Sequence, residues 1–303
     1  MPSVPATLDA LAARCRSEPA LAHTCALLAA VDGVEVAAHD LHGHGLDTPA
    51  PTIASVTKSL LSTVVGWAWA DGLLTRDTTL HDLLGDRVPA ARRAATVHHL
   101  LTMTSGAAGG LLEIDAIMEL PRGWVDTLLR APQLDPPGVV FRYDNGAWHL
   151  LSAMLRVAVG GGLLGYARER ALPPSGCAGV IWPVDPEGVP YGFGEARLSP
   201  RELLGFGEAW RTGVAAPDAY RAEAWRAHTT GGMPEHRGYG YGWWVGADAG
   251  VPSYLAAGWA GQAVLVVPAR SLTLVTTGCP ATWREGISRA VLPHLADVVA
   301  AAP

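Results

Sequence analysis

Lys58 is the only lysine of the chain, and the other Lys/Arg positions are all arginine. Ser55 stands three residues earlier, at the start of an apolar stretch that predicts a helix, so the two side chains share one helical face. An arginine stays protonated at any working pH, whereas a lysine amine shielded from water can lose its proton and serve as a base. We therefore interpret the pair as a serine nucleophile with a lysine activator.

A simpler interpretation makes Ser55 a helix N-cap and Lys58 a solvated side chain, which is the usual meaning of this spacing. The residues around Lys58 are apolar, however, and would bury an unpaired charge, so we favour catalysis. A helix N-terminus also stabilises negative charge through its dipole and its free N–H groups. The start of this helix is thus predicted to form part of an oxyanion hole.

Tyr143 and Asn145 form a second motif, Y-x-N, between a proline-rich loop and a helical pattern. A tyrosine phenol beside an ammonium group can relay protons, and an asparagine amide can hold both the lysine and a substrate carbonyl. Asp144 is expected to point away from Lys58, because a carboxylate beside the amine would keep it protonated. Alone, the Y-x-N motif is typical of a turn tyrosine and a helix cap. It supports a catalytic interpretation only because it occurs together with the Ser55 and Lys58 motif.

The third motif is the segment Gly258-Trp259-Ala260-Gly261-Gln262, between two predicted strands. The small residues Ala260 and Gly261 would let a substrate lie close to a strand edge. A backbone N–H in this segment is expected to complete the oxyanion hole. On its own the segment would be taken for a hairpin turn.

Together the three motifs resemble those of the serine β-lactamase and penicillin-binding protein superfamily, especially its class C-like esterases and 6-aminohexanoate-dimer-type amide hydrolases. The resemblance covers most of the chain. Three further stretches support it: Leu100 to Gly106, Pro137-Gly138 and Tyr241-Gly242-Trp243-Trp244.

The resemblance implies acyl transfer. Ser55 would attack a carbonyl, Lys58 and Tyr143 would share the proton, and water would then release the acyl group. The N–H groups of Ser55 and Gln262 would bind the oxyanion. Whether the amine or the phenolate takes the serine proton stays open at this point.

The third motif departs from the family pattern. Its β-lactamases and penicillin-binding proteins carry K-T-G or a histidine variant there, which supplies a cation for a substrate carboxylate, whereas this chain has Trp259-Ala260-Gly261. The missing cation argues against β-lactam hydrolysis and favours an apolar or neutral acyl group. Together with Asn145, the aromatic residues near this motif are candidate substrate contacts: Trp243, Trp244 and Trp259.

The elements that must position these motifs can also be predicted. Two apolar runs at 24–31 and 34–39 flank Asp32-Gly33 and indicate a hairpin. Residues 55–70 predict a buried central helix. Short helical patterns follow at 94–103, 124–130, 146–158, 163–171 and 200–210, then strands at 239–245, 254–257, 262–267 and 272–277, and a closing helix at 287–300.

This order predicts an α+β protein with an antiparallel sheet built from both chain ends, flanked by helices, and with an inserted mainly helical lobe. The resemblance makes it a β-lactamase-like fold. We expect a single domain over 1–303, with an α/β lobe at about 1–50 and 236–303 and a helical lobe at about 51–235. The cleft between the lobes is the expected place for the site.

Composition excludes several classes of function. With 303 residues and 49% hydrophobic content the chain can bury a substantial core, and a net charge of −6 argues against a nucleic-acid partner. The N-terminus lacks the pattern of a secretory signal, and no apolar run is long enough to cross a bilayer. The four cysteines, Cys15, Cys25, Cys177 and Cys279, show no metal-binding spacing, so we expect reduced thiols in a cytoplasmic protein.

A histidine-rich loop follows the first hairpin, with His39, His42 and His44 beside Asp40 and Asp47. Its spacing matches no zinc pattern, so a solvated loop is the favoured interpretation and no metal or other cofactor is expected. The G-x-S-x-G motif is absent, and a G-x-G-x-x-G match beginning at Gly160 follows a helical pattern instead of a strand.

The sequence thus predicts a serine hydrolase that cleaves a small-molecule ester or amide through an acyl-enzyme on Ser55. Two alternatives stay open. One is a transacylase in small-molecule biosynthesis, which passes the acyl group to an alcohol or amine. The other is a catalytically silent homologue that keeps only the binding pocket. The sequence does not specify the acyl group, the leaving group or the oligomeric state.

Overall fold

A single antiparallel sheet of eight strands, in the order β2-β1-β8-β7-β6-β5-β4-β3, organises the chain. The computed structural model describes residues 2–50, 52–109, 113–279 and 290–303. The strands are β1 Thr24–Val31, β2 Val34–Asp40, β3 Thr229–Gly232, β4 Arg237–Tyr239, β5 Trp244–Asp248, β6 Val251–Ala257, β7 Ala263–Val267 and β8 Leu272–Gly278. Because β1 pairs with β8, the two ends of the chain fold together, as the α+β prediction required.

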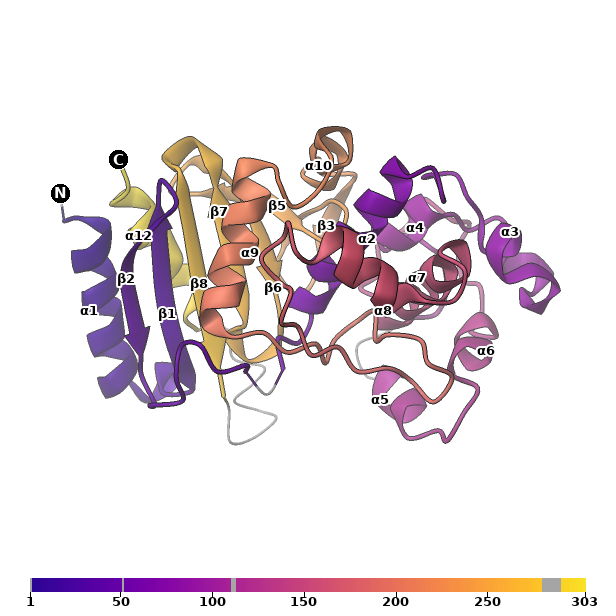
Figure 1. The fold of residues 1–303 in the computed structure, drawn as a ribbon, viewed down its shortest axis with the longest axis horizontal. Helices are drawn as coiled ribbons and strands as arrows, with labels where there is room; N and C mark the ends of the chain where they lie inside the picture. The colour runs from indigo at the N-terminus through magenta and orange to yellow at the C-terminus, as the bar shows by residue number, and fades with distance from the viewer. Residues whose placement is uncertain (1, 51, 110–112, 280–289) are drawn as a thin grey trace.

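Helices cover the sheet and extend to one side of it (Figure 1). They are α1 Val4–Ser17, α2 Val56–Ala70, α3 Leu80–Leu84, α4 Val97–Leu101, α5 Glu113–Met118, α6 Trp124–Leu129, α7 Asn145–Ala158, α8 Leu163–Tyr166, α9 Pro200–Thr212, α10 Asp218–Ala224 and α12 Leu295–Ala300. Strands β7 and β8 are buried along their whole length, which explains the continuous apolar run of β7. Helix α2 is buried on nearly all sides, as its sequence predicted.

The first hairpin lies where the sequence placed it, with Val31 opposite Val34 across the Asp32-Gly33 turn. The predicted helices at 124–130, 146–158 and 200–210 correspond to α6, α7 and α9, and 94–103 contains the shorter α4. Of the predicted closing helix, residues 290–300 contain a short 3-10 turn and α12, while 287–289 lie outside the described residues.

The predicted strand at 239–245 is wrong. Strand β4 ends at Tyr239 and β5 begins only at Trp244. Between them Gly242 takes a φ of 77°, and two serines of α2 donate to this turn, Ser59 to the Gly242 carbonyl at 2.6 Å and Ser62 to the Tyr241 carbonyl at 2.7 Å. These bonds fix the turn against α2 and interrupt the ladder.

Two helices change the predicted boundary between the lobes. Helix α1, which we did not predict, packs on β1 and β2. Helix α9 packs on β1, β7 and β8, although its residues fall within 51–235, the range assigned to the helical lobe. Because these helices join the chain ends and the middle of the chain to one sheet, we propose that the whole chain is one domain.

Two of the four cysteines are paired, contrary to the expected reduced thiols. Cys25 on β1 and Cys279, directly after β8, form a disulfide with their Cα atoms 6.0 Å apart. Cys15 and Cys177 are free and buried.

Among the described residues no single helix is long and apolar enough to cross a membrane. Only the pair Asn145–Ala158 and Leu163–Ala171, bent by 85°, reaches that length and composition together.

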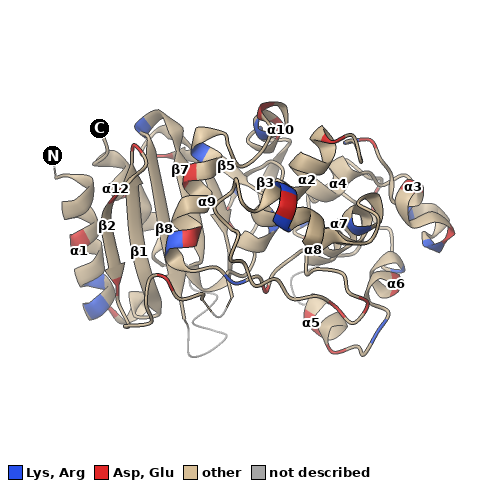
Figure 2. Ribbon diagram, in the orientation of Figure 1, with Lys and Arg blue, Asp and Glu red and all other residues tan. Residues whose placement is uncertain are grey.

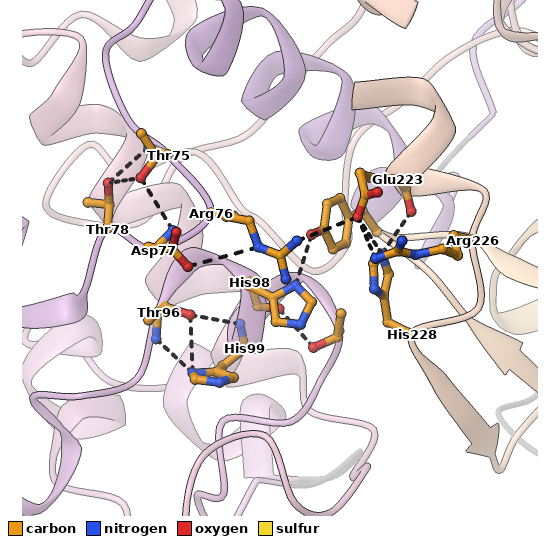
Figure 3. A network of polar contacts seen from close by, with 12 residues as sticks. Thr75, Arg76, Asp77, Thr78, Thr96, His98, His99, Glu223, Arg226 and His228 are labelled. Atoms are coloured by element: carbon orange, nitrogen blue, oxygen red, sulfur yellow. Dashed lines mark hydrogen bonds and ion pairs between the residues drawn. The ribbon is translucent and has the colours of Figure 1, made fainter. Parts of the chain in front are cut away.

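Charged residues of both signs are scattered over the ribbon in Figure 2. A polar network joins the helices around α4 to the segment that leads from α10 into β3 (Figure 3). In it Glu223 contacts Arg226 at 2.9 Å and Arg76 at 3.7 Å, and the His98 and His228 rings meet edge to face at 5.0 Å. The Arg76–Glu223 and His98–His228 contacts link segments more than 100 residues apart in the sequence.

Candidate active site

Ser55 stands at the tip of a tight turn that leads into α2. The preceding Ala54 has a φ of 46°, which is unfavourable for a residue with a Cβ and must be held by its surroundings. Backbone bonds provide this hold, since the Ile53 N–H donates to the Ala196 carbonyl at 2.8 Å and the Thr57 N–H donates to the Ala54 carbonyl at 3.1 Å. Ser55 is only partly buried, so its hydroxyl can be reached from outside.

The Lys58 amine is almost fully buried, with 2% of the residue exposed, and lies within hydrogen-bond distance of Ser55. Its Nζ is 2.7 Å from Ser55 Oγ, 2.8 Å from Asn145 Oδ1 and 2.8 Å from the carbonyl oxygen of Phe193. The predicted reach of one helical turn is therefore present, and the Asn145 amide holds the lysine as expected.

The two carbonyl oxygens around Nζ decide how the amine can meet Ser55. Asn145 Oδ1 and the Phe193 carbonyl can only accept hydrogen bonds, so each takes one N–H of the amine. A third position of Nζ is directed at Ser55 Oγ, 2.7 Å away. In the ammonium form that position donates an N–H to the serine oxygen, and in the neutral form its lone pair accepts the serine proton.

Tyr143 also lies beside the amine. Lys58 Nζ sits 4.9 Å from the centre of the Tyr143 ring, and the ring is stacked parallel to Trp244 with centres 6.0 Å apart. The aromatic face stabilises a positive charge on Lys58, and the stack limits how the tyrosine can turn. The structure thus brings together Ser55, Lys58, Tyr143 and Asn145 from the first two motifs.

Phe193 is a site residue that sequence reasoning missed, because it contributes only a backbone carbonyl, and its type carries no signal for that role. A buried pair of residues, His149 and Asp185, packs beside Phe193. His149 Nε2 lies 3.0 Å from Asp185 Oδ2, and the His149 and Phe193 rings meet edge-on with their centres 5.8 Å apart. Helix α7 therefore presents Asn145 to Lys58 and, one turn later, His149 to the segment that carries this carbonyl.

The third motif lies against the nucleophile turn. A Cβ added to Gly258 would be 2.9 Å from the Ile53 carbonyl and 3.0 Å from the Ser55 nitrogen, so only glycine allows this approach. Within the described part of the chain, no hydrogen bond takes up the Ser55 N–H. The Gln262 N–H makes a long bond of 3.4 Å to the Trp259 carbonyl, and its side chain donates to the Gly278 carbonyl at 2.7 Å. The motif is thus beside Ser55, with its glutamine side chain turned toward the end of β8.

The three tryptophans near this motif have different surroundings. Trp243 is fully buried and packs against Trp210 and Phe206 at 5.0 and 6.0 Å, so it is a core residue and its prediction as a substrate contact is wrong. Trp244 is 3% exposed and supports the Tyr143 ring from behind. Trp259 is the partly exposed one of the three, and it remains a candidate wall for a substrate.

Asp144 caps α7, since its Oδ1 accepts the Ala147 N–H at 3.1 Å. Its carboxylate lies against Gly109, where an added Cβ would be within 2.4 Å of all three carboxylate atoms. A cavity of about 390 Å³ opens beside it, lined also by the buried Arg92. Ser55, Lys58, Tyr143 and Asn145 are not among the residues that line this cavity.

No site residue belongs to a metal-ligand cluster among the described side chains. The cluster that the structure does contain is formed by Cys25, His44 and Cys279.

The chain belongs to the Beta-lactamase family, because the family profile matches residues 25–278. Its sheet and helices form the β-lactamase fold, and the family is one of serine hydrolase-type proteins. A comparison with curated protein sequences gives no match.

Solved structures support the fold. A protein assigned as a 6-aminohexanoate-dimer hydrolase from Bacillus anthracis has a TM-score of 0.75 at 16% identity, covering 93% of this chain and 81% of that one. EstCE1, described as a hydrolase with promiscuous acyltransferase activity, has a TM-score of 0.77 at 18% identity, with 97% and 98% coverage. A D-stereospecific amidohydrolase from Streptomyces sp. has a TM-score of 0.72 at 18% identity, with 89% and 93% coverage. At these identities the likeness concerns the fold alone.

Proposed function

We propose that the protein is a serine hydrolase that cleaves a small-molecule ester or amide through an acyl-enzyme on Ser55. One observation carries the proposal: a buried amine, oriented by two carbonyl acceptors, keeps its third tetrahedral position for Ser55 Oγ at 2.7 Å. A serine hydroxyl becomes an effective nucleophile when an adjacent base is held in this way.

In the first step Ser55 Oγ bonds to the substrate carbonyl carbon while its proton passes to the Lys58 amine. The carbonyl oxygen becomes an oxyanion beside the N–H groups of Ser55 and Gln262. When the intermediate collapses, the bond to the leaving group breaks and the leaving group takes a proton from Lys58, with Tyr143 as relay. Water then attacks the ester on Ser55 and gives its proton to the same amine. When this second intermediate collapses, the bond between the acyl carbon and Ser55 Oγ breaks, the amine returns the proton to Ser55 Oγ, and the acid is released.

The neutral third motif supports a substrate without a carboxylate at this point. Trp259 stands where the β-lactamases and penicillin-binding proteins of the superfamily carry a cation, and Ala260 and Gly261 leave room beside the backbone. An apolar or neutral acyl group fits such a surface better than an anion. We therefore propose esters and amides of neutral carboxylic acids as the substrate class.

Active-site labelling tests the proposal. A fluorophosphonate probe should add one phosphonyl group to the wild-type protein, as seen by intact mass, and none to Ser55→Ala. Ser59→Ala is the matched control, because Ser59 lies on the same helix but is buried and bonded to Gly242. Equal labelling of Ser55→Ala would reject Ser55 as the nucleophile, and an unlabelled wild type would favour a silent binding homologue.

A second candidate is acyl transfer to an alcohol or amine. The structural likeness to EstCE1 favours it, since that protein is a hydrolase with promiscuous acyltransferase activity. Product analysis of one nitrophenyl ester, with and without an added alcohol, separates the two functions. Faster ester consumption with a new ester as the main product would identify a transacylase.

A further inference from the structure

Three metal-ligating side chains converge outside the catalytic motifs. Cys25 lies on β1, His44 in the loop after β2, and Cys279 directly after β8, and their ligand atoms all lie within 4.8 Å of one another. Cys279 Sγ and His44 Nδ1 are 3.6 Å apart. That separation matches one edge of a tetrahedral site with metal–sulfur bonds of about 2.3 Å and metal–nitrogen bonds of about 2.0 Å.

The backbone places the two cysteines together independently of their disulfide. The Leu41 N–H donates to the Cys25 carbonyl at 2.8 Å, and the Cys279 N–H donates to the His23 carbonyl at 2.9 Å. Thr24 is in register with Gly278, so the start of β1 and the end of β8 are neighbours in the sheet. The two sulfur atoms therefore stay close when the disulfide is opened.

The loop that carries His44 is also held in place. The Asp40 carboxylate accepts four successive backbone N–H groups, those of residues 42 to 45, at distances from 2.8 to 3.3 Å. The His42 ring lies 2.9 Å from the Ala22 carbonyl, which ties the loop to the segment before β1. His44 thus reaches Cys279 from an ordered loop, and a ligand bound there would not have to order it.

We propose that reduced Cys25, reduced Cys279 and His44 form a binding site for a thiophilic divalent cation of the zinc type. A thiol or phosphine reductant supplies the two electrons, two protons complete the two thiols, and binding of the cation releases those protons. Two thiolates balance the double positive charge, and thiolate and imidazole are the donors that zinc prefers. Since His44 is exposed, a solvent molecule completes the fourth position.

The competing explanation is a disulfide that only cross-links the sheet. Such a cross-link requires the two cysteines and gives no role to His44, which nevertheless lies beside Cys279 at the end of an ordered loop. The substitution His44→Ala therefore separates the explanations. It leaves both cysteines in place and changes an exposed side chain, so the variant is expected to fold.

Cobalt binding provides the test. The full chain is reduced with a phosphine, freed of reductant without oxygen, and titrated with Co²⁺, whose thiolate charge-transfer band reports on sulfur ligands. We expect one equivalent to bind and Zn²⁺ to displace it. Cys25→Ser and Cys279→Ser should weaken the band strongly, and His44→Ala should weaken binding by tenfold or more, on the order of the effects that supporting residues alone have. The matched controls are Cys15→Ala, Cys177→Ala and His39→Ala.

Oxidation gives a second readout that does not depend on variants. A low-molecular-weight disulfide should release the bound metal as the Cys25–Cys279 bond forms again, with a mass loss of two hydrogen atoms. Two results would overturn the proposal. One is a reduced protein that shows no thiolate–cobalt band, which would leave a structural disulfide only. The other is metal binding that His44→Ala leaves unchanged, which would exclude His44 as a ligand and with it the three-residue site.

Discussion

Gly258 offers the sharpest test of how the third motif meets the nucleophile. Its backbone angles, φ −137° and ψ 167°, are open to any residue, so an alanine there brings no conformational strain. The added Cβ would nevertheless lie 2.9 Å from the Ile53 carbonyl and 3.0 Å from the Ser55 nitrogen. The effect of Gly258→Ala is therefore a displacement at the site.

The size of the effect follows from these distances. Ordinary van der Waals contact begins at about 3.4 Å, so the segment at 258 must move away from Ser55 by about 0.5 Å. Catalytic groups tolerate displacements of about this size poorly, and the loss of one oxyanion donor costs about 10² to 10³ in kcat. We expect about a 10²-fold fall in kcat, equal to about 2.7 kcal/mol of transition-state stabilisation. Overpacking should lower the free energy of unfolding by about 1–3 kcal/mol.

Steady-state hydrolysis of a nitrophenyl ester, beside a urea unfolding curve, measures both effects. Gly205→Ala is the matched control, because Gly205 lies in α9 and its added Cβ meets no atom within 4 Å. A folded Gly258→Ala protein whose kcat stays within about threefold of the wild type would refute the oxyanion role of this segment.

The other predictions concern the amine, the phenol and acid stability. Lys58→Arg should lower the acylation rate by about 10³-fold although the charge is kept, because a guanidinium cannot take the serine proton; near-normal stopped-flow acylation would remove Lys58 from the base role. Tyr143→Phe keeps the ring that stacks on Trp244 and should still lower kcat by more than about tenfold, and a smaller effect would exclude a proton relay. Burial lowers the pKa of His98 to about 4 and lowers the pKa values of His99 and His228 as well. The pKa values of these histidines in the folded protein lie below the unfolded value of about 6.5, so the unfolded chain binds more protons between these pH values. Their contribution to the free energy of unfolding should therefore be complete above about pH 6.5 and decrease toward about pH 4. The slope is at most about 1.4 kcal/mol per pH unit for each proton. Urea unfolding at about pH 7.5 and about pH 5 measures this loss of stability. The loss should be smaller in His98→Gln. An equal loss in that variant would show that the pH dependence does not come from His98 in the network of Figure 3.

Some missed elements had signals in the sequence. Helix α1 has buried residues at Val4, Leu8, Leu11 and Cys15, a helical spacing, and Ser3 stands before them as the N-cap. The break between β4 and β5 was signalled by glycine at 240 and 242, but the serines of α2 that hold the turn are distant in the sequence.

The local part of the site was determined by the sequence. Ser55 and Lys58 are one helical turn apart, and helix geometry alone brings an amine and a hydroxyl at that spacing together. The order of the strands and helices likewise follows from local patterns, so the α+β class and the sheet made from both chain ends could be predicted.

Only the tertiary structure decided which distant groups meet these residues. The Phe193 carbonyl that orients Lys58 comes from a loop 135 positions along the chain, and burial in the core removed Trp243 from the site. His44 lies beside two cysteines only because β1 and β8 pair and bring Cys25 and Cys279 next to its loop. The physical reason is the same in each case: contacts between distant segments depend on strand pairing and packing, which leave no periodic trace in the local sequence.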